Sequence, residues 1–267
     1  MYAFTYHKPS SVRQAAAMLA KSEDAKILAG GHTLLPTMKQ RLASPSSLID
    51  LAGLPELKGI ERKGRSVTIG AMTPHAEVAA SGVVREAIPG LAELAELIGD
   101  PHVRHRGTIG GSVANNDPSA DYPAALLALD ATVVTNKRKI AADEFFQGLF
   151  VTALEEGEIV TRVSFPVAQK AAYAKFRNPA SRYALAGVFV AKRAGEVRVA
   201  VTGASENGVF RWSAAEEALG KRFAAKSLEG MAPSPDGMIS DIHADAAYRA
   251  HLVGVMARRA VQAAAGR

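Results

Sequence analysis

The sequence predicts a chain of mixed α-helices and β-strands that is divided into two parts near Pro166. Before this proline, short apolar strand patterns alternate with helical patterns in which apolar residues recur every three or four positions. After it, three segments of strand type follow one another closely, as in an antiparallel meander, and a long helical pattern ends the chain. We therefore expect one domain over residues 1–166 and a second over residues 167–267.

The first part is expected to begin with a helix over 12–20, which Ser10 or Ser11 can cap because a serine side chain accepts a hydrogen bond from the first free amides. A strand over 26–29 leads into a glycine-rich loop. Pro36 is tolerated in the first turn of the helix that follows. The other elements expected here are strands at 48–51, 131–135 and 158–165, a hairpin over 60–70, and helices at 34–42, 74–80, 87–98 and 124–129.

The second part is expected to hold a small antiparallel sheet of three strands, at 173–177, 184–192 and 196–202. Two helical patterns follow, at 214–219 and 246–265, and a linker rich in proline and glycine joins them. Trp212 is the only tryptophan, and its large apolar ring is expected to pack inside this part.

Composition excludes several kinds of site. The 267 residues include no cysteine, so this chain can form no disulfide and can ligate no iron–sulfur cluster through cysteine. No apolar run approaches the length that spans a bilayer, and the first nine residues lack the basic and then apolar pattern of a leader. We therefore expect a soluble, cytoplasmic protein that is not bound to a membrane.

Charge is unevenly distributed along the chain. The net charge of +6 divides into −1 over residues 1–165 and +7 over residues 166–267. Dense basic clusters are short, as at Lys137-Arg138-Lys139, and no aromatic residues alternate with them, so ordinary surface charge is favoured over nucleic-acid binding. A partner protein with an acidic face would explain the asymmetry equally well, which makes the basic region a candidate docking surface.

Two glycine-rich loops carry most of the chemical information: Ala29-Gly30-Gly31-His32-Thr33 and Thr108-Ile109-Gly110-Gly111-Ser112. Consecutive glycines let neighbouring amide groups converge on one anion, because no Cβ blocks the approach. Neither loop has the Rossmann or the Walker pattern of glycines. One Gly-Gly pair alone is more often a structural turn, but two such pairs, each with a threonine beside it, predict a site for a diphosphate.

The loops and their surroundings resemble one family. The segment Ala29-Gly30-Gly31-His32-Thr33-Leu34-Leu35-Pro36 is similar to the first flavin loop of the medium, FAD-binding subunit of molybdenum hydroxylases, the relatives of carbon monoxide dehydrogenase and xanthine dehydrogenase. Residues 106–115 resemble the second loop of that family, and 117–121 follow it in the same order. Further similarity at 4–9, 70–77 and 178–184 extends the resemblance over nearly the whole chain.

The resemblance implies an α+β fold. A two-subdomain FAD-binding domain of the vanillyl-alcohol oxidase type would cover residues 1–166 and divide near 53–58. A small C-terminal domain with a three-stranded antiparallel sheet and helices would cover 167–267. FAD would lie between the two subdomains and be bound without a covalent bond.

The resemblance also implies the residues that bind this cofactor. The main-chain amides of both loops and the Thr33 hydroxyl would contact the diphosphate. Asp121 would accept a hydrogen bond from a ribose or a flavin group, Ile159 or Val160 would contact the adenine or the ring system, and Tyr183 would lie near the isoalloxazine. The full expected set is Ala29, Gly30, Gly31, His32, Thr33, Leu34, Thr108, Ile109, Gly110, Gly111, Ser112, Asp121, Ile159, Val160 and Tyr183. No catalytic residue and no metal ligand is expected from this chain.

Two positions depart from the family pattern. Ser112 and His105 both stand where the family commonly has asparagine. Serine keeps a donor and an acceptor but is shorter, so we expect cofactor binding to survive with one contact made through water. His32 lies within the first loop, and the resemblance implies that it carries no covalent flavin.

The remaining histidines and the arginines of the second loop allow simpler interpretations. His75, His102 and His105 do not have the spacing of a helical metal-ligand pair, so loop or surface positions are expected for them. Arg104 and Arg106 are equally compatible with binding phosphate and with bracing the loop through carboxylates.

The resemblance implies a FAD-binding electron-transfer subunit. Substrate would be oxidised at a molybdenum cofactor in a large subunit, and electrons would pass through two [2Fe–2S] clusters of a small subunit to FAD in this chain. They would then leave to an external acceptor such as NAD, oxygen or a quinone. The lack of cysteine is consistent with clusters that lie in another chain. We expect a hetero-oligomer, specifically a dimer of heterotrimers.

Two alternatives belong to other classes. The fold could serve as a FAD-free scaffold that acts only in complex assembly, but the intact glycines of both loops argue against it. A self-contained flavin oxidase is the least favoured, because the segment after residue 166 offers only about one hundred residues for a substrate domain.

Overall fold

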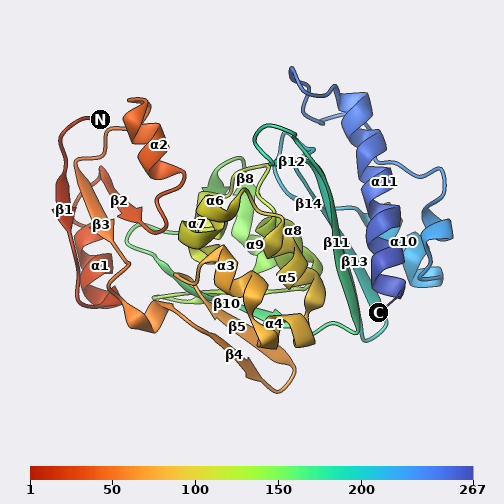
Figure 1. Cartoon of the computed structure of the whole chain (residues 1–267), viewed down its shortest axis with the longest axis horizontal. Coiled ribbons are helices and arrows are strands. Elements are labelled where there is room, and N and C mark those ends of the chain that lie inside the picture. The colour runs from red at the N-terminus through yellow and green to blue at the C-terminus, as the bar shows by residue number, and fades with distance from the viewer. Residues whose placement is uncertain (267) are drawn as a thin grey trace.

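The computed structural model describes residues 1–266, and these form three larger sheets that follow one another across the long dimension of the molecule (Figure 1). The N-terminal sheet is parallel, in the order β1-β3-β2, with strands β1 (Thr5–His7), β2 (Ala25–Leu28) and β3 (Ser47–Asp50). Helix α1 (Val12–Leu19) follows Ser11, whose hydroxyl accepts a hydrogen bond from the Gln14 amide and caps the helix as predicted. Helix α2 (Leu34–Lys39) follows the first glycine loop.

The central sheet is antiparallel, in the order β4-β5-β10-β6-β7. Its strands are β4 (Ile60–Lys63), β5 (Ser66–Gly70), β6 (Thr132–Thr135), β7 (Lys139–Ala141) and β10 (Val160–Pro166). A 3₁₀ turn, η1 (Pro55–Leu57), precedes it, and a two-stranded ribbon of β8 (Phe146–Gly148) and β9 (Val151–Thr152) lies beside it. Its helices are α3 (His75–Ala80), α4 (Gly82–Ala87), α5 (Pro89–Glu96), α6 (Pro101–Arg106), α7 (Ile109–Asn115), α8 (Tyr122–Ala128) and α9 (Ala142–Phe145).

The helix expected over 87–98 is present as α5, but it begins at Pro89 and ends at Glu96. Helix α4 ends at Ala87, Ile88 adopts a non-helical conformation with φ −143° and ψ 69°, and α5 begins at Pro89. Proline disfavours the helical conformation of the residue before it but suits the first turn of a new helix, so the chain turns there. Helices α6 and α7 are not expected from the sequence, because histidines, arginines and glycines give them no apolar period.

The C-terminal sheet contains the three predicted antiparallel strands, β11 (Lys170–Arg177), β12 (Ala184–Arg193) and β13 (Glu196–Thr202). A two-residue edge strand, β14 (Phe210–Arg211), is a fourth strand that the sequence analysis does not predict. The helical elements that follow are α10 (Ser213–Lys221), the 3₁₀ turn η2 (Ala225–Leu228) and α11 (Ala246–Ala265). Trp212 is buried in this part, as expected.

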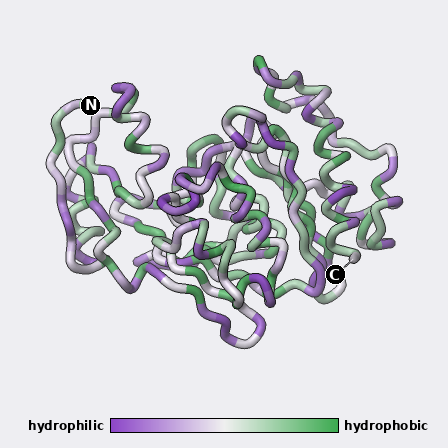
Figure 2. Tube along the Cα trace, in the orientation of Figure 1, coloured by the Kyte–Doolittle hydropathy of each residue, from purple (hydrophilic) through white to green (hydrophobic). Residues whose placement is uncertain are grey.

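This C-terminal sheet lies between two layers of helices, because its strands are apolar on both faces. On β12, Phe189 and Ala191 belong to the core shared with α5 and α8, whereas Val188 and Val190 face the core beneath α11. A separate small core holds the N-terminal sheet. Figure 2 shows the hydrophobic stretches of the trace in the central elements and along this sheet, and a hydrophilic turn between β4 and β5. Within residues 1–266 no helix is both long and apolar enough to cross a membrane.

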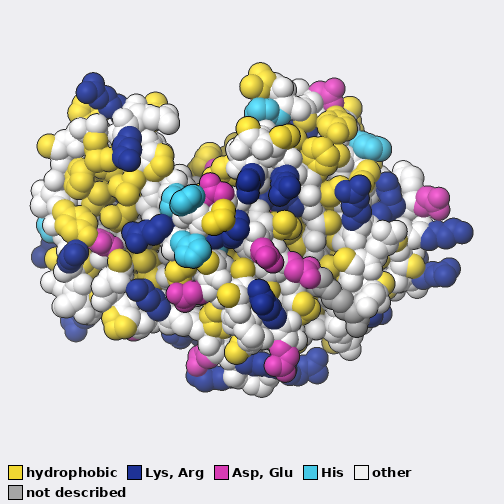
Figure 3. Space-filling model, in the orientation of Figure 1, with side chains coloured by type: hydrophobic (Ala, Val, Ile, Leu, Met, Phe, Trp, Pro, Cys, Tyr) yellow, Lys and Arg dark blue, Asp and Glu magenta, His cyan; other side chains and the backbone are white. Residues whose placement is uncertain are grey.

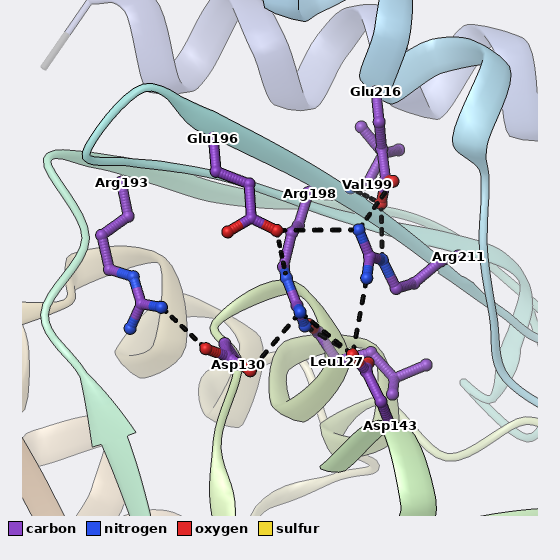
Figure 4. Close-up of polar contacts among 9 residues, drawn as sticks. All are labelled: Leu127, Asp130, Asp143, Arg193, Glu196, Arg198, Val199, Arg211 and Glu216. Atoms are coloured by element: carbon purple, nitrogen blue, oxygen red, sulfur yellow. Dashed lines mark hydrogen bonds and ion pairs between the residues drawn. The ribbon is translucent and has the colours of Figure 1, made fainter. Parts of the chain in front are cut away.

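A network of charged side chains connects the C-terminal sheet to the central part through ion pairs and hydrogen bonds (Figure 4). The Arg198 guanidinium on β13 donates to the Leu127 carbonyl at 2.9 Å and pairs with Asp143 at 3.0 Å. Asp130 accepts from Arg193 at 2.7 Å. Because Asp130 and Asp143 belong to the central part, the network fixes how the sheet sits against α8.

Candidate cofactor-binding cleft

A cleft of about 690 Å³ is lined by residues of the N-terminal part, the central part and the loop between β11 and β12. Its walls come from the loop between β2 and α2, the segments around α6 and α7, the end of β9 through the start of β10, and the loop before β12. Figure 3 shows the molecule notched between the N-terminal part and the central part, with basic and histidine side chains along the notch. All of the residues expected to bind cofactor line this cleft, with the single exception of Ile109.

The first glycine loop presents a row of main-chain donors. Among residues 1–266, the amides of Gly30 through Leu34 donate to no protein acceptor, and the Thr33 hydroxyl has no partner. Gly31 has φ +76°, a left-handed conformation that favours glycine, and a Cβ there would lie 2.9 Å from the Leu35 side chain. Free amides that lead into a helix form a binding site for an anion, which fits a diphosphate.

The second glycine loop differs from the expectation, because much of it is the start of helix α7. The Ile109 amide donates to the Thr73 carbonyl at 3.2 Å, and the Gly110 amide donates to the Ala71 carbonyl at 2.8 Å. The Thr108 hydroxyl caps α7 by accepting from an amide of the first turn at 3.2 Å. These donors are used within the protein, and Ile109 itself is buried in the core.

The two loops touch each other through glycine. A Cβ on Gly30 would lie 2.1 Å from the Arg106 carbonyl oxygen and 2.7 Å from the Gly107 Cα. A Cβ on Gly111 would lie 3.3 Å from the Ala29 Cβ. The absence of these side chains therefore brings the free amides of the first loop directly against the second.

Asp121 is buried at one wall of the cleft and is held by the C-terminal sheet. Its carboxylate accepts from the Tyr173 hydroxyl at 2.5 Å and from the Lys175 ammonium at 3.0 Å. Lys175 also donates to the Leu97 carbonyl at 3.0 Å. A carboxylate has about four acceptor sites, so Asp121 keeps capacity for a further donor such as a ribose hydroxyl.

Ile159 and Val160 line the other end of the cleft and are buried. The side-chain oxygen of Asn136 accepts from the Ile159 amide at 2.7 Å, and the Asn136 amide donates to the Ile159 carbonyl at 3.0 Å. The main-chain groups of Ile159 are thus engaged within the protein. The contact that Ile159 can offer a ligand is apolar.

Glu158 lies beside them and forms a buried polar cluster. Its carboxylate accepts from Thr135 at 2.7 Å and pairs with Arg138 at 3.1 Å. Burial alone would raise the pKa of Glu158, but hydrogen bonds from Arg138, Thr135 and a neighbouring amide lower this pKa to about 2.

Tyr183 projects at the cleft mouth from a short loop and is 47% exposed. The side chain of Asn178 accepts from the Ala180 amide at 2.9 Å and the Ser181 amide at 3.1 Å, which fixes the loop. Arg182 adopts φ +64° just before the tyrosine. This conformation turns the chain into β12, and the tyrosine ring is left at the mouth of the cleft.

A hairpin at the same cleft carries a residue that the sequence analysis misses. Phe150 lines the cleft, is 59% exposed and has φ +56°. The Asn116 side chain donates to the carbonyls of Gly148 and Val151 at 2.7 and 2.8 Å, and the Phe150 amide donates to the Asn116 carbonyl at 3.1 Å. Asn116 is itself left-handed, with φ +45°, which asparagine tolerates better than most residues. Apart from this asparagine, no sequence signal marks the hairpin.

The structure also shows the positions and contacts of His75 and Arg104, near the second loop. The expected loop or surface position of His75 is wrong, because this residue is buried at the start of α3 and lines the cleft. Within residues 1–266 no group of three or more potential ligands could hold a metal ion. Arg104 donates to the carbonyls of Ile98 and Gly99 at 2.9 and 3.1 Å, so it braces the segment before α6 through carbonyls rather than carboxylates.

The chain is similar to known proteins over nearly its whole length. Residues 2–168 match the family described as the FAD binding domain in molybdopterin dehydrogenase. The chain is 38% identical to the carbon monoxide dehydrogenase medium chain of Hydrogenophaga pseudoflava, over 98% of this chain and 96% of that one. It is 37% identical to the nicotine 6-hydroxylase medium subunit of Paenarthrobacter nicotinovorans, over 99% of this chain and 98% of that one. Its structure is similar to that of reconstituted CO dehydrogenase from Oligotropha carboxidovorans, with a TM-score of 0.89, 36% identity and coverage of 100% and 99% of the two chains.

The fold and the cleft together define a dinucleotide-binding component of an oxidoreductase. More particularly, the chain belongs to the family of FAD-binding domains of molybdopterin dehydrogenases, and FAD is the cofactor of that family. The α+β fold and the family resemblance expected from the sequence are confirmed.

The close contact between the loops predicts that a single added methyl group at Gly30 lowers the stability of the protein. Gly30→Ala should destabilise the protein by about 2 kcal/mol or more, because its Cβ would overlap the Arg106 carbonyl, a backbone atom that cannot swing away. Denaturant unfolding measures this change. Gly82→Ala is the matched control, since a Cβ there meets nothing within 4 Å and alanine suits the first turn of α4. Equal stability of Gly30→Ala and the wild type would contradict the contact.

The Glu158 cluster predicts a dependence of stability on pH. Because the folded-state pKa of about 2 lies below the ordinary 4.5, the cluster stabilises the protein fully above pH 4.5, and this contribution is lost as pH falls toward 2. Glu158→Gln should cost roughly 2 kcal/mol at pH 7, with allowance for the solvent around Arg138. The variant should then lose less stability than the wild type between pH 4.5 and 2.

Unfolding free energies measured by urea across this pH range test the prediction. Glu156→Gln, at an exposed neighbouring carboxylate, is the control and should follow the wild type. Parallel curves for Glu158→Gln and the wild type would show that Glu158 is not the group responsible.

Proposed function

We propose that this chain is the FAD-binding electron-transfer subunit of a molybdenum hydroxylase complex. The observation that carries the proposal is the row of free amides at Gly30 through Leu34, which lies against the second loop in a cleft of about 690 Å³. Membership of the FAD-binding family supports FAD as the occupant of that cleft.

When bound, FAD supplies the redox chemistry, taking up electrons and releasing them to an acceptor. The residues of this chain bind and orient it. The amides of the first loop would hold the diphosphate, Asp121 would accept from a ribose or flavin hydroxyl or amide, and Tyr183 would lie beside the ring system. Ile159 and Val160 would offer apolar contact. We retain residues 1–166 as the FAD-binding domain and 167–267 as the C-terminal domain.

The proposed partners follow from what this chain lacks. It holds no cysteine, so [2Fe–2S] clusters that deliver electrons to the flavin must belong to another chain. The relatives are named as a medium chain and a medium subunit, which implies complexes with further chains. We therefore propose a molybdopterin-binding large subunit and a [2Fe–2S] small subunit as partners, in a dimer of heterotrimers, and an external acceptor such as NAD, oxygen or a quinone.

Purification of the chain by itself tests the cofactor assignment. We expect a yellow protein with one FAD for each chain and no turnover of the organic substrate, because that reaction would take place in the large subunit. Absorbance of FAD released by denaturation gives the stoichiometry. A colourless protein that still assembles with its partners would favour the FAD-free scaffold.

The electron-transfer role is tested in the assembled complex with Gly31→Val. A β-branched residue cannot adopt φ +76° without strain, so the variant should lose FAD, while the nearest atoms that its Cβ meets belong only to Leu35 and Leu28 of the N-terminal part. Substrate should then reduce the iron–sulfur clusters while the external acceptor stays oxidised. If the acceptor is reduced at the wild-type rate by the FAD-free complex, the proposed electron path is wrong.

A further inference from the structure

His75 is a buried residue to which the sequence analysis and the proposed function assign no role. It is 4% exposed, and among residues 1–266 neither nitrogen of its ring has a hydrogen-bond partner. The hydroxyl of Tyr122, whose ring centroid lies 5.4 Å from that of His75, has no partner either. Buried polar atoms are almost always hydrogen-bonded, so these two groups are unusual, and the position of His75 at the wall of the cleft allows its ring to contact a ligand there.

The ring of His75 lies where the two glycine loops meet. The His75 amide donates to the Gly107 carbonyl at 2.9 Å, and a Cβ on Gly107 would lie 2.6 Å from the His75 Nε2. The first loop contacts the same residue, because a Cβ on Gly30 would lie 2.7 Å from the Gly107 Cα. His75, Gly107 and Gly30 all line the cleft. The imidazole of His75 and the first loop, which carries the free amides, therefore both contact Gly107.

The two ring nitrogens differ in their surroundings. Nδ1 is enclosed by protein, whereas Nε2 lies against Gly107, which lines the cleft, and has no hydrogen-bond partner among residues 1–266. Burial, together with the nearby His32 and Arg104, lowers the pKa of His75 to about 3, so the imidazole is neutral near pH 7. A neutral imidazole carries one N–H donor, and a donor at Nε2 would suit an anionic oxygen.

A metal ion does not explain the site, since no group of three or more potential ligands is present among the described residues. A phosphate oxygen does explain the site, because the first loop lies beside His75 and offers free amides for the same anion.

We propose that His75 is a further cofactor-binding residue, whose Nε2–H donates to an oxygen of the diphosphate held by the first loop. This inference rests on the proposed binding of FAD in the cleft. Tyr122 acts as a positioning residue, because its ring packs against the imidazole and sets the tilt of 49° between the two rings.

Substitutions at position 75 distinguish the two nitrogens. His75→Phe keeps an aromatic ring but removes both, and it should weaken FAD about ten- to hundredfold, the effect of losing one hydrogen bond to a charged group. His75→Gln places an amide nitrogen near the former Nε2 and should recover most of the affinity. His75→Asn places an amide nitrogen near the former Nδ1 and should not recover the affinity for FAD. A role in packing alone would not separate glutamine from asparagine in this way.

The experiment uses the full chain freed of FAD, with dissociation constants measured by titration calorimetry for FAD, ADP and adenosine. His75→Phe should weaken FAD and ADP by the same factor and leave adenosine unchanged, because only the first two carry a diphosphate. His102→Gln, at an exposed histidine of α6, is the matched control. Tyr122→Phe keeps the supporting ring and should bind FAD within about twofold of the wild type.

The outcomes separate the two proposals. Failure of the wild-type chain to bind FAD would overturn the proposed function itself. If the wild type binds FAD and His75→Phe binds it equally well with an unchanged unfolding midpoint, the role of His75 alone is wrong. A loss in Tyr122→Phe as large as that in His75→Phe would also overturn it, because the hydroxyl rather than Nε2 would then be responsible.

Discussion

The close approach of Gly30 to the main chain at Arg106 and Gly107 is the constraint on which the cleft depends. The first loop belongs to the N-terminal sheet and the second to the central part, and the two are joined at a point where no Cβ fits. Backbone atoms in such contact cannot relax as a flexible side chain would. The free amides between Gly30 and Leu34 are thereby placed at the junction, where an anion can reach them.

The two loops contribute in different ways, although their sequences look alike. In the first loop the amides are free because Gly31 takes a left-handed conformation and the chain then enters α2. In the second loop the amides of Ile109 and Gly110 are used to dock α7 on the end of β5. The first loop supplies donors, whereas the second supplies the rigid surface against which those donors are held.

The C-terminal sheet completes the cleft through polar contacts. Tyr173 and Lys175 on β11 hold the carboxylate of Asp121 at the start of α8, so a wall residue of the cleft depends on a distant part of the chain. A buried ion pair is costly to break from one side, because it leaves the other charge buried and unpaired. The Arg198 network reinforces the same junction from further along the sheet. Orientation of the C-terminal sheet and the shape of the cleft are therefore linked.

Sequence patterns were enough to predict most strands, the long final helix and the position of the glycine loops, but not α6, α7 or β14. Apolar period predicted the strands around residues 184–202 and the long final helix, because such signals are local. The residues expected to bind cofactor line the cleft with one exception, because glycine pairs and their neighbours can be recognised in a sequence, whereas other lining residues such as His75 and Phe150 were not expected there. Only the tertiary structure shows which amides stay free. It also shows that the main-chain groups of Ile159 hydrogen-bond Asn136 and that His75 is buried beside Gly107. These depend on which segments distant in the chain meet, and a local pattern carries no information on a partner that lies on another element.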